Sequence, residues 1–550
     1  MELSTLDSPA AAAQPLVSPP VGPALTASAP AINPWLIAMT VTIATFMELL
    51  DTSIANVSLP HIAGGLATSY DESTWVLTSY LIANAVVLPL SAWLSRVFGR
   101  KRYYMACVAI FSVSSVLCGL APSLGSLIAF RVIQGIGGGG LAPVEQAILV
   151  DTFPAAKRAA AFALYSMAIV TAPAIGPILG GWITDSFTWR WIFFINLPLG
   201  VLSLFLTNRL VSDPPAFQEE VARLRKSGHL RIDIVGIVLV AVGFACLEVV
   251  LDRGQQEDWL ESPLITTFLI VALLALVIGY LWEWHHDDPV VEVTLLKDRN
   301  FALASSFYFL FGVVLFGSTV LIPQLLQSLY GYSATDAGFV LGPGAFVIVL
   351  MAPVVVRLVK RIPVRGLIMF GYVVLALSMW YFASFNLFTD YRREAAARAL
   401  QGFGFAFLFI PISQLAYSNL PPSKNNKASS LTNLFRNLGG SVGIAFVTTL
   451  FARRSQFHQS VLVTHLTNGD LTLQRTVTGI TERLVSVGHT TADAVQTAPA
   501  VVGLLVRQQA ALLGALDCFR VLGVLAVLAP LLALAIKSFD QTGRRPSGGH

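Results

Sequence analysis

The chain has 550 residues, of which 55% are hydrophobic and only 12% are charged, with a mean hydropathy of +0.70. Soluble domains carry about 25% charged residues, so this composition excludes an ordinary soluble protein and indicates that most of the chain faces lipid or other apolar helices. The net charge of +4 does not indicate nucleic-acid binding, because the basic residues lie in short segments between apolar runs.

Residues 1–34 contain no Lys or Arg and are rich in Ala, Pro and Ser. A cleaved signal peptide needs a basic start followed by an apolar core, and this segment has neither. We therefore expect 1–34 to be a disordered cytoplasmic tail.

The remainder contains fourteen runs that match the roughly 20 apolar residues needed to span a bilayer. They lie at 35–59, 74–95, 103–122, 126–150, 159–183, 190–210, 232–251, 263–282, 303–329, 337–359, 365–386, 395–419, 431–451 and 513–536. The chain is thus predicted to be an all-α membrane protein with 14 transmembrane helices.

Loop charge predicts the orientation of these spans, because cytoplasmic loops carry an excess of Lys and Arg. RVFGRKR at 96–102 and most other basic clusters follow even-numbered spans, whereas 60–72 and 121–126 contain no positive charge. The pair Arg392–Arg393 is an exception. Both termini are expected in the cytoplasm.

An internal repeat divides the chain. RVIQGIG at 131–137 returns as RALQGFG at 398–404, so that Arg131 and Arg398 are 267 positions apart. This offset pairs span four with span twelve, which leaves two extra spans between two six-helix units, an arrangement of 6+2+6. The predicted units are a tail at 1–34, a six-helix bundle at 35–211, two inserted helices with linkers at 212–300, a six-helix bundle at 301–537 and a cytoplasmic tail at 538–550.

The first span carries two acids, Glu48 and Asp51, three residues apart and therefore on one helical face. An acid in a membrane span is expensive to insert and is by default a candidate functional residue. Desolvation raises the pKa of a carboxyl and a nearby cation lowers it, so a carboxyl held between the two can bind and release protons near neutral pH. Asp51 is the stronger candidate because it lies deeper in the apolar run. The alternative is a structural carboxylate fixed by hydrogen bonds to neighbouring helices.

Arg131, in span four, is predicted to lie within about a turn of the depth of Asp51. A guanidinium does not lose its proton in a protein, so Arg131 would modulate a carboxylate rather than carry the proton. The alternative is that it extends to the outer surface. Two further acids lie in the spans, Glu145 in span four and Glu248 in span seven, and the sequence leaves open whether they share the proton path. For Glu145 the alternatives are that it binds a cationic substrate or forms a salt bridge to the 96–102 loop.

Span five is rich in Pro and Gly, which suits a pliable contact between the two halves or simple close packing. The residues concerned are Pro173, Gly176, Pro177, Gly180 and Gly181. Polar or aromatic residues within spans are candidates for a substrate cavity between the halves. These are Asn84, Gln134, Tyr308, Gln324 and Gln327, whereas most Phe side chains are expected to face lipid.

Residues 452–512 form a long polar connection on the outer side. Such a loop either has a function or is an irregular insertion, and we expect a docking surface for a periplasmic partner. GIGGGG at 135–140 fits the letters of a dinucleotide motif but lies in a spanning run rather than after a strand. No P-loop or catalytic grouping appears, and the four Cys are isolated, so neither an enzyme, a cofactor nor a metal site is predicted.

These motifs resemble the major facilitator superfamily, in particular its fourteen-helix drug:proton antiporters of the EmrB/QacA group and most closely the EmrB branch. LDTSIANVSLP is similar to the first-helix motif whose acid maps onto Asp51, RVIQGIGGGG to the motif whose arginine maps onto Arg131, and GPILGG at 176–181 to the antiporter signature. AWLSRVFGRKR resembles the family's loop motif but has Ala92 and Arg96 where Gly and Asp are usual.

The resemblance implies a proton-driven multidrug exporter of a bacterial inner membrane for hydrophobic or amphipathic compounds. It also implies a periplasmic adaptor and an outer-membrane channel as partners in a tripartite pump. The alternatives are a dedicated exporter of a metabolite, fatty acid or siderophore, and a proton-coupled uptake symporter.

Overall fold

The computed structural model describes residues 33–213, 218–219, 221, 233–286, 289–421, 424–464, 466 and 471–537. The predicted tails therefore lie outside the described residues, apart from 33 and 34. The described chain is helical and contains no strand. Backbone groups in a bilayer need partners within the protein, and a helix provides these within each span.

The fourteen predicted spans are confirmed, since fourteen helices of the described residues are long and apolar enough to cross a membrane. In the N-terminal half they are α1 (Pro34–Val57), α4 (Trp75–Phe98), α5 (Arg100–Leu120), α6 (Leu124–Gly138) continued by α7 (Leu141–Thr152), α8 (Ala155–Ser186), and α9 (Trp191–Phe194) continued by α10 (Asn196–Leu210). In the C-terminal half they are α14 (Arg299–Ser328), α15 (Ala334–Leu358), α16 (Val364–Phe382), α17 (Tyr391–Ala416), α18 (Asn425–Thr464) and α20 (Thr491–Ala533).

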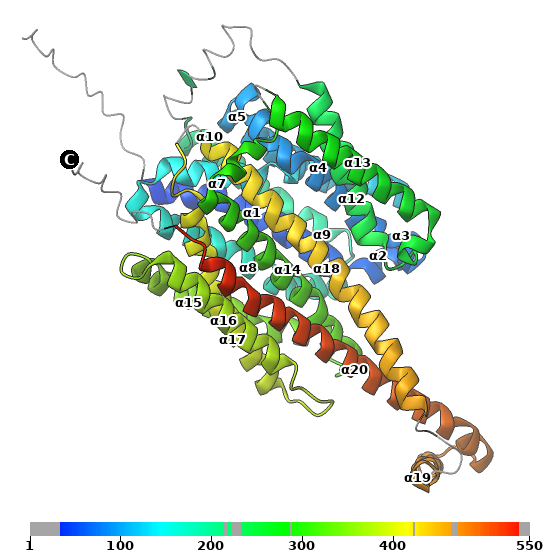
Figure 1. Cartoon of the computed structure of the whole chain (residues 1–550). Helices are drawn as coiled ribbons and strands as arrows, with labels where there is room; N and C mark the ends of the chain where they lie inside the picture. The colour runs from blue at the N-terminus through cyan, green and yellow to red at the C-terminus, as the bar shows by residue number, and fades with distance from the viewer. Residues whose placement is uncertain are drawn as a thin grey trace, which may run out of the picture.

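The two extra spans, α12 (Ile234–Arg253) and α13 (Pro263–His285), form a helix pair that packs against α4 and α18 (Figure 1). Short helices α2 (Leu59–Leu66) and α3 (Tyr70–Ser73) connect α1 to α4, and the 3-10 turns η1 (Trp259–Glu261) and η2 (Val293–Lys297) flank α13. The break between α6 and α7 falls at Gly139 and Gly140, in the glycine run of the sequence. Fourteen spans in a 6+2+6 order are thus the observed architecture.

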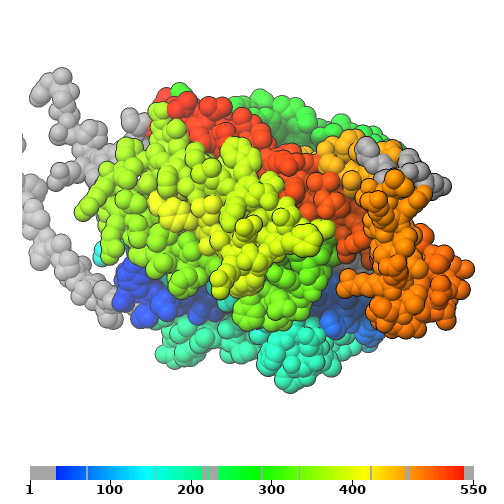
Figure 2. Space-filling view, turned by 90° about the horizontal axis from the view of Figure 1, so that it is seen from below, coloured from blue at the N-terminus to red at the C-terminus, as the bar shows by residue number. Residues whose placement is uncertain are grey.

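The two ends of the helix bundle differ in which parts of the chain lie there. We call the end at which α1 begins and α20 ends the termini face, and the opposite end the hairpin face, because α18, α19 (Leu471–Ser486) and α20 project from it as a hairpin (Figure 1). Figure 2 shows part of this hairpin, in orange, standing clear of the main body. Within 452–512, where the sequence indicated only a polar connection, most residues are helical. The apolar run ends near 451, but the helical backbone does not need apolar side chains to continue.

The two halves are tied together at the termini face by a set of polar contacts that we call the clamp. Asn425 donates to Asp151 at 2.7 Å, Ser430 donates to the Leu88 carbonyl at 2.8 Å, and the Ser95 hydroxyl accepts from Asn426 at 3.2 Å. The first turns of α18 therefore close against the C-terminal half of α4 and the end of α7.

An ion triad reinforces the clamp from the linker before α14. Glu292 pairs with Lys424, just before α18, and with Lys427 in its first turn, and the Lys424 Nζ lies 2.6 Å from Glu292 Oε1. Burial alone would raise the pKa of Glu292, but hydrogen bonds from the two lysines hold it below its ordinary value. Glu292 therefore carries its negative charge at neutral pH.

Candidate ion-coupling site

Asp51 is buried in the interior of the N-terminal half, with 2% of its surface exposed. Its Oδ2 lies 2.6 Å from Nη1 of Arg131, and its Oδ1 accepts from Gln134 at 3.0 Å and from Asn196 at 2.6 Å. Three donors from α6 and α10 thus converge on one carboxylate of α1. Such donors offset the large cost of burying an ionised group.

Arg131 has no exposed surface, so it does not extend to the membrane surface. Its Nε donates to the Val76 carbonyl at 3.0 Å, its Nη1 also donates to Gln134 at 2.8 Å, and its guanidinium lies 4.3 Å from the ring centroid of Tyr80. Because α4, α6 and α1 all hold this guanidinium, its position depends on how those helices pack. The predicted proximity of Asp51 and Arg131 is present in the structure.

Glu48 lies one turn before Asp51 and has neutral partners only. Its Oε1 accepts from Asn84 at 3.0 Å and from the Tyr80 hydroxyl at 3.3 Å. Tyr80 therefore connects the two acids. Its hydroxyl donates to Glu48, and its ring lies against the guanidinium of Arg131, which is the partner of Asp51. Asn84, predicted to line a cavity, is a partner of this acid.

Glu145 is fully buried on α7 and accepts from Thr42 of α1 at 2.6 Å. The proposed salt bridge to the 96–102 loop is not formed, since Arg100 pairs with Asp151 instead. Counted along α1, the contacts of Thr42, Glu48 and Asp51 cover about 13 Å of helix at 1.5 Å per residue. A series of acids thus runs from Asp51 toward the termini face.

The second half repeats this arrangement without its acid. Arg398 donates to Gln401, and Gln401 donates to the hydroxyl of Ser318 at 2.7 Å, as Gln134 donates to Asp51. Ser318 lies 267 positions after Asp51, the offset of the sequence repeat. The duplicated framework therefore holds a carboxylate at this position in the N-terminal half and a hydroxyl in the C-terminal half.

The Pro/Gly segment of α8 packs against the residues of α1 that follow Asp51. Gly176 is so close to Ser53 that a Cβ there would collide with its side chain, and a Cβ on Gly180 would lie 3.1 Å from Ile54. Pro177 has no N–H, so the carbonyl of Pro173 lacks its helical donor, and the Ser53 hydroxyl donates to it at 3.2 Å. The same helix packs against α15 of the other half.

The remaining predicted cavity residues separate into two groups. Tyr308 is buried between the halves and bonds to Ser413, and Gln134 belongs to the Asp51 cluster. Gln324 and Gln327 are exposed near the end of α14 at the hairpin face, so they do not join the buried polar residues. Sequence position alone did not indicate which side of α14 they occupy.

Sequence reasoning missed two polar residues in the interior. Asn196 completes the Asp51 cluster and also donates to Ser115 at 3.0 Å. Arg436 is a buried arginine of α18 that donates to the Tyr165 hydroxyl at 3.0 Å. The available signal was the same for both, a strongly polar residue in an apolar run. Among the described residues, no three His, Cys, Asp or Glu side chains are grouped as a metal site would require.

Comparison with known proteins shows which sequences resemble this chain. The sequence profile of the Major Facilitator Superfamily matches residues 41–444. The chain is 39% identical over 430 residues to multidrug export protein EmrB of Escherichia coli K12, covering 78% of this chain and 82% of that protein. It is 36% identical over 512 residues to fatty acid resistance protein FarB of Neisseria gonorrhoeae, covering 92% of this chain and 96% of that protein.

The fold agrees with these matches. The solved structure of the proton:xylose symporter XylE superposes with a TM-score of 0.57 at 14% identity, covering 90% of this chain and 94% of that one. This likeness concerns the fold alone. The resemblance to the EmrB branch is confirmed by the sequence matches over most of the chain. With fourteen spanning helices, a duplicated six-helix unit and this profile match, the chain belongs to the Major Facilitator Superfamily.

Proposed function

We propose that the chain is a proton-driven exporter of hydrophobic and amphipathic compounds, with Asp51 as the principal proton-binding group. The observation that carries this proposal is the Asp51 cluster, a fully buried carboxylate held by Arg131, Gln134 and Asn196 in only one of the two repeats. The name of the relative EmrB, a multidrug export protein, supports export as the direction of transport.

In this mechanism a proton arriving from the hairpin face binds Asp51 and removes its negative charge. The attraction that fixes Arg131 is then lost, and the packing of α1, α4 and α6 around the guanidinium changes. The clamp opens and the proton leaves toward the termini face, while substrate moves the other way. A charge that crosses with the potential supplies about 2.3 kcal/mol per 100 mV.

Orientation and partners belong to the same proposal. The termini face would lie in the cytoplasm of a bacterial cell and the hairpin face in the periplasm, in line with the basic residues of the clamp and the 96–102 loop. α18 has 40 residues and is about 60 Å long, against a hydrocarbon core of about 30 Å. Its hairpin would reach a periplasmic adaptor and, through it, an outer-membrane channel.

Direction of flux tests the proposal. Purified protein is reconstituted into vesicles that contain a pH-sensitive dye and are loaded with a cationic or anionic amphiphile, and the vesicles are then diluted. Antiport predicts that substrate leaving the vesicles acidifies the interior. An interior that becomes alkaline would identify the symport alternative, and no pH change with normal substrate efflux would remove proton coupling.

The alternative of a dedicated fatty acid exporter is favoured by one finding, the match to FarB over 92% of this chain. Competition decides between the two. A multidrug exporter transports several unrelated dyes that inhibit one another, whereas a dedicated exporter moves fatty acid and leaves the dyes behind.

A further inference from the structure

Arg436 is a buried cation near the boundary between the two halves. Only 4% of its surface is exposed. Its Nη1 donates to the Tyr165 hydroxyl of α8 at 3.0 Å, and its Nε and Nη2 each lie 3.3 Å from the side-chain oxygen of Asn437. Among the described residues, no carboxylate lies within 4.0 Å of this guanidinium, in contrast to Arg131. Its partners are therefore neutral.

The nearby acids are committed elsewhere. Glu48 and Glu145 feel the positive charge of Arg436 at longer range, but their hydrogen bonds go to Tyr80, Asn84 and Thr42. An arginine in a membrane span is usually paired with an acid or faces a polar cavity. Arg436 lacks the first of these, which leaves its charge available to a ligand.

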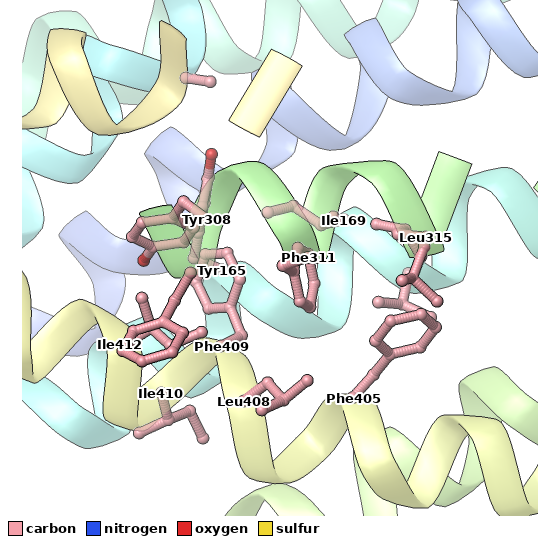
Figure 3. Close-up of a cluster of buried hydrophobic side chains, with 14 of the residues drawn as sticks. Tyr165, Ile169, Tyr308, Phe311, Leu315, Phe405, Leu408, Phe409, Ile410 and Ile412 are labelled. Carbon is pink, nitrogen blue, oxygen red and sulfur yellow. The ribbon is translucent and has the colours of Figure 1, made fainter. Parts of the chain in front are cut away.

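An aromatic cluster borders this cation. Phe409 of α17 lies 5.5 Å from Tyr165, 5.7 Å from Tyr308 and 5.9 Å from Phe311, measured between ring centroids. Figure 3 shows these rings converging from α8, α14 and α17. Tyr165 joins the two environments, because its hydroxyl meets Arg436 while its ring packs on Phe409. Charge and apolar surface thus lie side by side.

We infer that Arg436 is the anion-binding residue of the substrate site, and that the aromatic cluster holds the apolar part of the same ligand. The ligand class is an amphipathic carboxylic acid, since a guanidinium and a carboxylate form two parallel hydrogen bonds. This inference rests on the proposed export function. Arg436 has no counterpart in the repeat, because the residue 267 positions earlier is Ile169.

Three ligands of equal chain length test the inference by direct binding to the purified full chain in lipid nanodiscs. They are dodecanoate, the neutral dodecanol and the cation dodecyltrimethylammonium. Arg436→Gln is expected to weaken dodecanoate binding by about 10- to 100-fold, the range for a hydrogen bond to a charged group. Dodecanol should bind unchanged and the cation as well or better. Arg436→Lys should recover part of the dodecanoate binding.

A purely structural role for Arg436 gives a different pattern. Tyr165→Phe removes the bond that ties Arg436 to α8 but keeps the positive charge, so it should preserve the preference for the anion. If Arg436→Gln weakens all three ligands equally, or leaves dodecanoate binding unchanged, the inference is wrong. Should Arg436→Gln fail to fold, Arg436→Lys with equal losses for all three ligands would also overturn it.

The result is separable from the fate of the proposed function. If the wild-type chain moves no protons but still binds dodecanoate through Arg436, proton coupling fails and the anion site stands. If protons are exchanged for dyes while Arg436→Gln changes no anion affinity, the anion site fails alone.

Discussion

Asp51 accepts hydrogen bonds from three separate side chains, so the role of each residue in the cluster can be tested by a single substitution. Asp51→Asn keeps the shape of the side chain and removes its ability to take up a proton. We expect substrate-driven proton movement in vesicles to fall to background while the protein still inserts and purifies. Ser318→Ala, at the equivalent position of the other repeat, is the matched control and should retain transport. Normal coupling in Asp51→Asn would exclude Asp51 as the carrier.

Asn196 provides a graded test at the same scale. Asn196→Leu removes a donor to a charged group, an interaction worth about 1.5–3 kcal/mol, and should reduce both the melting temperature in detergent and the proton flux. Ser115 accepts a hydrogen bond from Asn196 and donates one to the Phe193 carbonyl, and no hydrogen bond between it and Asp51 occurs among the described residues, so the effect of Ser115→Ala should be smaller. Equal losses in the two variants would mean that Asn196 acts through packing rather than through Asp51.

Individual residues also show what sequence reasoning can reach. Asp51 and Arg131 were identifiable because an unusual charge occurred in each of two recognisable motifs. Asn196 and Arg436 were not, because a single polar residue in an apolar run does not reveal which neighbour it meets. The assignment of Gln324 and Gln327 to a substrate cavity stays a prediction, because the sequence does not define which face of α14 points inward and both side chains are exposed near its end.

Among elements, the contact of α8 with α1 is sensitive to volume. Gly176→Ala would push against Ser53, and overpacking of this kind costs about 1–3 kcal/mol. We expect a lower melting temperature and reduced coupling, since α1 carries Asp51. Gly342→Ala in α15 is the matched control because no heavy atom lies within 4 Å of its new Cβ. Equal tolerance of both substitutions would show that α8 does not need this close approach.

The ion triad of the clamp has a defined pH response. Because the pKa of Glu292 is lowered in the folded state, its stabilising contribution is fully present above the ordinary Glu pKa of about 4.3 and is lost as pH falls through the lowered value. Glu292→Gln should therefore reduce stability by on the order of 1–3 kcal/mol at pH 7 and by less near pH 4. Thermal unfolding at both pH values checks this. A deficit that grows on acidification would contradict it.

The extent of the helices could be predicted only in part. Hydropathy located every span because lipid requires an apolar surface over a fixed thickness. Hydropathy ended one predicted span at 451 and began the next at 513, whereas α18 continues to Thr464 and α20 begins at Thr491. Outside the bilayer an exposed helix needs no apolar run, and the polar residues of 452–512 are compatible with either a loop or a helix.

For the molecule as a whole, the hairpin separates two kinds of transport. Deleting α19 (471–486) while keeping its flanking residues should abolish export across the cell envelope and leave transport in vesicles intact. Phe388→Ala, which removes a 94% exposed side chain from the α16–α17 connection on the same face, should affect neither. Loss of vesicle transport in the deletion variant would show that the hairpin supports the bundle itself.

The pairing of the two halves was accessible from sequence because the 267-residue offset occurs in both motif and helix order. The contacts that close the two halves against each other could not be predicted from the sequence. The clamp joins Asn425, Ser430 and Glu292 to residues that are not at equivalent positions of the repeat. Such contacts depend on the angle between the two bundles, and a single sequence does not indicate that angle.

α18 is a single helix that carries clamp residues at its first turns, Arg436 next, and at its far end a projecting stalk in which it pairs with α20. A rigid rod turning about its middle moves both tips in opposite directions. Release of Asn425 and Ser430 would therefore swing the stalk, and a protein gripping that stalk would resist the release. An attached envelope component could thereby slow or hasten the cycle mechanically, without contacting the compound being moved.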